Sequence, residues 1–109
     1  NRVMLFDSLS VEKQLEIIKS ETGYTNEAVI RKMIECADVI RQKIKDESID
    51  GAAISIRNLI NWAHDIQETG DILLSAWPTM VWAVKYDDED VQREIFEDVI
   101  QPRFQGVRP

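Results

Sequence analysis

The residues that could do chemistry gather at the start of one predicted helix, in the stretch ISIRNLINWAHDI, residues 54–66. Apolar residues at helical spacing form one stripe there, namely Ile56, Leu59, Ile60, Ala63 and Ile66. Ser55 is of a type that caps helix N-termini. Arg57 falls in the first turn, where the helix already carries partial positive charge and a cation costs about 0.3–1 kcal/mol. Surface helices often tolerate that cost, so Arg57 is either an ordinary surface residue or a functional one.

The functional interpretation of Arg57 is anion binding. If its guanidinium and the backbone N–H groups of the helix N-terminus point the same way, they would share one anion. Phosphate is the most natural candidate, because arginine donates two hydrogen bonds to it in a fixed geometry.

Nucleophilic catalysis has weaker support. The chain has one cysteine and one histidine. Cys36 lies on the apolar stripe of another predicted helix, which favours a small buried side chain. His64 lies on the flank of its helix and is expected at the surface or its boundary. The two could form a nucleophile pair only if their helices brought them together.

No metal site is predicted. The sequence has neither H-E-x-x-H nor C-x-x-C. An acidic run could bind a hard cation, but it is more simply the start of a helix whose dipole favours negative charge. The run consists of Asp87, Asp88, Glu89 and Asp90.

Composition excludes several classes of protein. The 109 residues carry a net charge of -7, which argues against a general nucleic-acid binder. No apolar run approaches the roughly 20 residues of a membrane helix. A single cysteine excludes an internal disulfide and favours a reducing compartment, so we expect a cytoplasmic protein. Neither G-x-x-x-x-G-K-[ST] nor G-x-G-x-x-G is present, so this chain alone should not cradle a triphosphate.

The pattern predicts an all-α fold, a compact bundle of four to five helices with at most a short strand near residues 2–6. One helix begins after Ser10 and stops at Gly23, and the next begins after Thr25 and ends in a polar loop. The helix with Arg57 closes at Gly70. The apolar stretch 71–86 contains Pro78, which predicts a kink or a break.

The last predicted helix, EDVQREIFEDVI, is capped by Asp88 and precedes Pro102. Residues 1–101 are thus expected to form a single helical domain, and residues 102–109 an irregular tail. Because the chain begins with Asn1, we expect a piece of a longer protein. Trp62, Trp77 and Trp82 are either core residues or part of a partner surface, and sequence alone does not decide between the two.

The stretch ISIRNLINWA, residues 54–63, resembles the sensor 2 helix in the C-terminal lid of AAA+ ATPases. Further segments agree in order. The pair NR resembles the end of the ALxxRF segment, with Val3 where the family has Phe. LSVEKQLEIIKSETG resembles the helix that leads into the lid, and AWPTMVWAVKYDDEDVQREIFEDVI resembles the closing lid helices of the MoxR and CbbQ/NorQ branch. The resemblance extends from Arg2 to Ile100.

The resemblance implies specific roles. Residues 1–9 would be the end of the core ATPase domain and a linker. Arg57 would be the sensor 2 arginine that contacts the γ-phosphate of ATP, with Ser55 and Asn58 also at the nucleotide. Arg2 would be an arginine finger acting on the neighbouring subunit's nucleotide. ATP, with Mg²⁺, would be bound together with the core domain, and the fragment alone should be inactive.

The resemblance also implies partners. The domain would pack on its own AAA+ core in a homo-oligomeric ring, a hexamer, which remodels a client. A von Willebrand factor A domain protein and a client metalloenzyme are the implied partners, with no role for nucleic acid or membrane. The alternative is a non-catalytic helical protein–protein interaction domain. A helix-turn-helix regulator ranks third, because the helix offers only Arg57 and His64 as basic groups.

Overall fold

Capping residues and glycines set the limits of the first helix. The computed structural model describes residues 10–47, 54–85 and 89–109. Helix α1, Val11–Thr22, begins after Ser10, whose side chain accepts a hydrogen bond from the Lys13 N–H, and ends at Gly23 with a φ of 76°. That left-handed conformation suits glycine, which has no Cβ to clash. Both predicted ends of this helix are confirmed.

Helices α2 and α3 follow the predicted pattern closely. Helix α2, Glu27–Glu47, starts after Asn26, whose Oδ1 accepts from the Val29 N–H at 3.2 Å. Helix α3, Ile56–Thr69, ends at Gly70 with a φ of 72°. The α3 stripe predicted from spacing is buried throughout.

Pro78 does not break its helix. The chain passes from α4, Ile72–Ala76, through a π-helical turn, η2, Trp77–Val81, into α5, Trp82–Lys85. Proline has no N–H to give to the carbonyl of Leu74, and the Trp77 N–H bonds that oxygen instead. The Trp82 N–H then reaches back five residues to the Trp77 carbonyl. The predicted disturbance therefore takes the form of a wider turn.

The C-terminal segment corrects one expectation. Helix α6, Glu89–Glu94, continues through the π-helical η3, Ile95–Ile100, into α7, Gln101–Phe104. Residues 102–104 are therefore helical, although an irregular tail was expected from residue 102. Phe104 is 3% exposed and belongs to the core. Burial of this aromatic ring favours continuation of the helix past Pro102, and the Gln101 N–H closes the π-helical turn on the Phe96 carbonyl just before the proline.

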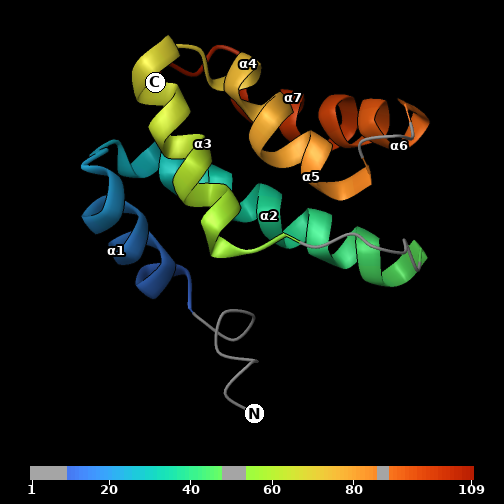
Figure 1. Ribbon diagram of the computed structural model, residues 1–109, viewed down its shortest axis with the longest axis horizontal. Helices are drawn as coiled ribbons and strands as arrows, with labels where there is room; N and C mark the ends of the chain where they lie inside the picture. The colour runs from blue at the N-terminus through green and yellow to red at the C-terminus, as the bar shows by residue number, and fades with distance from the viewer. Residues whose placement is uncertain (1–9, 48–53, 86–88) are drawn as a thin grey trace.

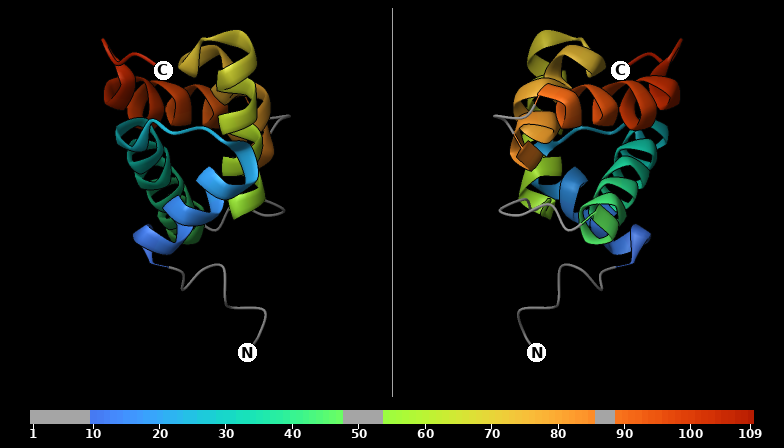
Figure 2. Two further views of the ribbon diagram at one scale, coloured as in Figure 1. Left: turned by 90° about the vertical axis from the view of Figure 1, so that its left-hand side faces the viewer. Right: turned by 90° about the vertical axis from the view of Figure 1, so that its right-hand side faces the viewer.

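The helices pack around α2 and α3. Helix α1 contacts both, and the segment α6–η3–α7 packs along α2 (Figure 1). The two side views show the red C-terminal helix lying across the teal α2 (Figure 2). Trp62 is fully buried, and its Nε1–H donates to the Ile72 carbonyl at 3.0 Å. The rings of Trp62 and Phe104 pack edge to face, with their centroids 5.5 Å apart. The described residues form an all-α bundle, as predicted.

Several predictions fall outside the part of the chain that the structure describes. They concern the strand at residues 2–6, Arg2, the polar loop around Gly51 and the cap at Asp88. Within the described segments, no helix is both long and apolar enough to cross a membrane.

Candidate functional site

The start of α3 is built by a pair of polar residues. Ser55 has extended backbone, with φ −121° and ψ 173°, as an N-cap residue should. The backbone N–H and the Oγ of Ser55 both donate to Asn58 Oδ1, at 2.9 and 3.2 Å. The Asn58 N–H donates in return to the Ser55 carbonyl at 3.1 Å. This reciprocal arrangement resembles a capping box, with asparagine in place of the usual Glu or Gln.

Two neighbouring elements hold this helix start in place. From η2, the Thr79 carbonyl accepts a hydrogen bond from Asn58 Nδ2 at 3.0 Å. From α2, Arg41 Nε donates to the Ile54 carbonyl at 3.0 Å. The Arg41 side chain is mostly covered, and its Nη1 also pairs with Asp38 at 3.0 Å. The backbone before the cap is therefore bonded to α2, and after the cap the side chain of Asn58 is bonded to the backbone of η2.

Arg57 is left exposed by this arrangement. Its neighbours Ile56 and Leu59 are buried in the core, which turns Arg57 outward. It makes no hydrogen bond or ion pair with any described residue, and the first turn of α3 holds no acidic residue. The guanidinium is thus available to an external anion at a fixed helix N-terminus.

Ser55, Arg57 and Asn58 all lie at the start of α3, but Arg57 is exposed whereas Ser55 and Asn58 are partly buried. The polar atoms of Asn58 are already engaged, with Oδ1 accepting from Ser55 and Nδ2 donating to Thr79. Ser55 and Asn58 therefore support the helix start. That they also contact a nucleotide stays a prediction, as does the role of Arg57.

Sequence reasoning missed Arg41 and Thr79. Arg41 lies on a different helix and contacts the site through a backbone carbonyl, so no spacing in the sequence points to it. Thr79 contributes only its carbonyl oxygen, a group that every residue has. Neither role leaves a signal in a single sequence.

Cys36 and His64 do not form a nucleophile pair. Cys36 is fully buried, with Sγ 3.9 Å from the Val99 carbonyl, and burial raises the pKa of its thiol to about 12. The nearby charges of Arg103, Glu35 and Lys32 act on it, and His64 is not among them. His64 is exposed. Cys36 is therefore the small buried side chain that its position predicts.

The acidic run is only partly described. Asp87 and Asp88 lie outside the described residues, while Glu89 and Asp90 stand in the first turn of α6. Among the residues that the structure describes, no group of three or more His, Cys, Asp or Glu could hold a metal ion.

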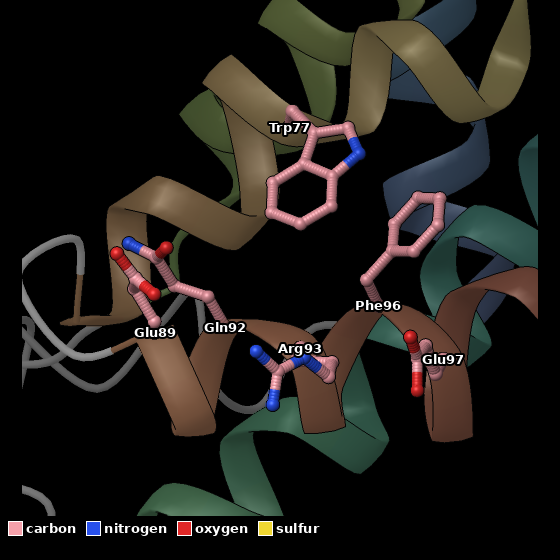
Figure 3. Close-up of a pocket in the computed structure, with 6 residues that line it drawn as sticks. All are labelled: Trp77, Glu89, Gln92, Arg93, Phe96 and Glu97. Atoms are coloured by element: carbon pink, nitrogen blue, oxygen red, sulfur yellow. The ribbon is translucent and has the colours of Figure 1, made fainter.

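The three tryptophans have different surroundings. Trp62 is a core residue, Trp77 is half-buried and stacks on Phe96 with ring centroids 4.7 Å apart, and Trp82 is 51% exposed. The stacked pair lines a hollow of ≈ 390 Å³ between η2 and the C-terminal helix (Figure 3). The other lining residues come from one helix, namely Glu89, Gln92, Arg93 and Glu97.

The fold and the site together define a small helical domain that presents an arginine at a rigidly held helix N-terminus. Residues 14–101 match the family described as CbbQ/NirQ/NorQ C-terminal. Since the match spans most of the chain, this protein belongs to that family, the C-terminal lid of AAA+ ATPases of the MoxR/CbbQ type. No curated protein and no solved structure matches the chain.

Proposed function

We propose that this lid carries the sensor 2 arginine of an ATPase, and that this residue is Arg57. The observation that supports the proposal most strongly is the isolation of its guanidinium at the N-terminus of α3, in a chain of this family. A cation that has no described partner costs stability there, and a γ-phosphate would supply the missing negative charge.

Arg57 would act in cis, on the ATP that is held by the core domain of its own subunit. Its charge would stabilise the negative charge that develops on the transferring phosphoryl group. Mg²⁺ would be held by residues of the core, which this chain does not contain. Arg2 is proposed to contact the nucleotide of the neighbouring subunit.

The client-facing part of the proposal follows from family membership. The assembled ring, a cytoplasmic hexamer, would use changes in lid angle to remodel a client protein in a chaperone-like manner. A von Willebrand factor A domain protein would be the partner and a metalloenzyme the client. The lid alone should not hydrolyse ATP, because the chain has no phosphate-binding glycine-rich loop.

The test is ATPase turnover of the ring-forming protein with Arg57→Ala, with nucleotide affinity measured alongside. Removing one cation from the transferring phosphate should lower kcat by about 10²-fold or more, because such groups act mainly in the transition state. His64→Ala, a second exposed position on α3, is the matched control and should leave turnover unchanged. Unchanged turnover and affinity in a folded Arg57→Ala protein would make Arg57 an ordinary surface residue.

A further inference from the structure

An exposed apolar stripe runs along the segment that contains α4, η2 and α5. Leu74 is 59% exposed, Trp82 is 51% exposed, and Pro78 lies halfway between them and is also exposed. The four-residue spacing places these residues along one side of the helix. Tryptophan is rarely left in water without a reason and is enriched at the centres of protein interfaces. We call Leu74, Pro78 and Trp82 the apolar stripe.

The stripe adjoins the aromatic hollow. Trp77 precedes Pro78 in the chain, and its ring stacks on Phe96 at an interplanar angle of 27°. The close-up shows the two rings facing the hollow from opposite helices (Figure 3). With ≈ 390 Å³ available, the hollow has room for a long side chain from another molecule.

Two glutamates and one arginine are among the residues that line the hollow, so its lining carries excess negative charge. Glu89 and Glu97 line it, are exposed, and make no hydrogen bond or ion pair with any described residue. Arg93 lies between them on the helix, but its guanidinium pairs with Asp90 at 3.5 Å. The hollow therefore combines a π face with two carboxylates, the surroundings that attract a guanidinium or an ammonium group.

We propose that the hollow and the apolar stripe form a docking site for a basic amphipathic segment of a partner protein. An arginine or lysine of that segment stacks against Trp77 between Glu89 and Glu97. Apolar residues of the same segment cover Leu74 and Trp82, as in other helix-in-groove interfaces. This site is distinct from Arg57 and does not depend on the proposed ATPase role.

Charge selects this occupant over two others. A second copy of the chain would bring its own net charge of -7 toward an acidic surface, which is unfavourable. Nucleic acid would be repelled by the same carboxylates. A basic segment is attracted by them, and its apolar face removes Trp82 from water.

The test titrates this protein into a labelled amphipathic peptide of arginine, leucine and alanine, about 18 residues long, and measures the dissociation constant from the fluorescence anisotropy of the peptide. A peptide with glutamate in place of arginine is its control. Glu89→Gln with Glu97→Gln should weaken binding of the basic peptide about tenfold, and Trp82→Ala by a similar factor. The matched double variant Glu21→Gln with Glu68→Gln removes the same charge elsewhere and should weaken it less than about twofold.

Three results would overturn the proposal. One is no binding of the basic peptide at an ionic strength of about 0.15 M. Another is equal weakening by the two double variants, which would mean general charge attraction. The third is concentration-dependent self-association that Trp82→Ala abolishes, which would make the stripe a contact between copies. Circular dichroism of each variant establishes that it is folded, and the exposed positions chosen should leave the fold intact.

Discussion

Arg41 Nε donates to the carbonyl oxygen of Ile54 at 3.0 Å, so that α2 holds the backbone one residue before the Ser55 cap. Ile54 is itself buried, which makes this carbonyl costly to leave without a donor. The contact joins residues 13 positions apart in the sequence and fixes where α3 begins.

Replacing this arginine tests the contact directly. Arg41→Leu keeps much of the side-chain volume but removes the donor, and should lower the free energy of unfolding by about 1–3 kcal/mol. Urea denaturation measures the change. Arg93→Leu, which removes an exposed arginine from a surface pair, should cost less than about 1 kcal/mol. Equal losses in the two variants would show that the Ile54 contact contributes nothing special.

Asn58 offers a second test of the same helix start. Asn58→Ala loses the acceptor for Ser55 and the donor to Thr79, and should cost about 1–3 kcal/mol. Asn58→Asp keeps the acceptor but sets a carboxylate oxygen against the Thr79 carbonyl, so it should also destabilise. Thermal unfolding compares the two variants. An Asp variant more stable than the wild type would mean that the cap matters and the bond to η2 does not.

Phe104 should behave as a core residue in spite of its place near the C-terminus. Phe104→Ala removes a buried ring and its edge contact with Trp62, and should cost about 3–5 kcal/mol. Denaturant unfolding followed by tryptophan fluorescence measures the loss. Gln105→Ala, at the exposed neighbouring position, is the control and should change stability by less than about 0.5 kcal/mol. A small loss for Phe104→Ala would contradict the packing seen here.

The buried thiol should make stability depend on alkaline pH. The pKa of Cys36 is raised to about 12 in the folded chain against an ordinary value of 9.0, so the unfolded chain loses this proton first. The resulting stabilisation is present below pH 9 and is lost as the pH rises from about 9 toward 12. At pH 10.5 the loss from this group should be about 2 kcal/mol.

The comparison of wild type with Cys36→Ala isolates that effect, because all other titrating groups are shared. The wild type should lose more stability than Cys36→Ala between pH 8 and pH 10.5, as measured by urea denaturation at each pH. A thiol reagent should also label native Cys36 far more slowly than the unfolded chain. Parallel pH profiles for the two proteins would show that the folded thiol ionises normally.

Most of the fold could be predicted from the sequence, because local signals coincide with the packing. Ser10, Gly23 and Gly70 mark helix ends where the structure has them, and apolar spacing marks the buried face of α3. The prediction of an irregular tail was wrong for residues 102–104, because a local rule for proline was outweighed by burial of Phe104 against Trp62, a residue more than 40 positions away.

The candidate site was predictable only in part. Arg57 could be singled out because a cation in a first helical turn opposes the helix dipole, an effect confined to neighbouring residues. The contacts of Arg41 and Asn58 to other helices depend on tertiary packing and leave no local pattern. The aromatic hollow also escaped prediction, since Trp77 and Phe96 meet only after two helical segments have packed.

The double attachment of the α3 start has a mechanical consequence. Because α2 holds the Ile54 carbonyl and η2 holds the Asn58 side chain, each through a hydrogen bond, α3 cannot shift alone without breaking one of them. A pull on the guanidinium would therefore be transmitted to three helical segments at once. In the proposed ring, a force on Arg57 would then rotate the lid as a rigid body, and any bending would take place outside the bundle.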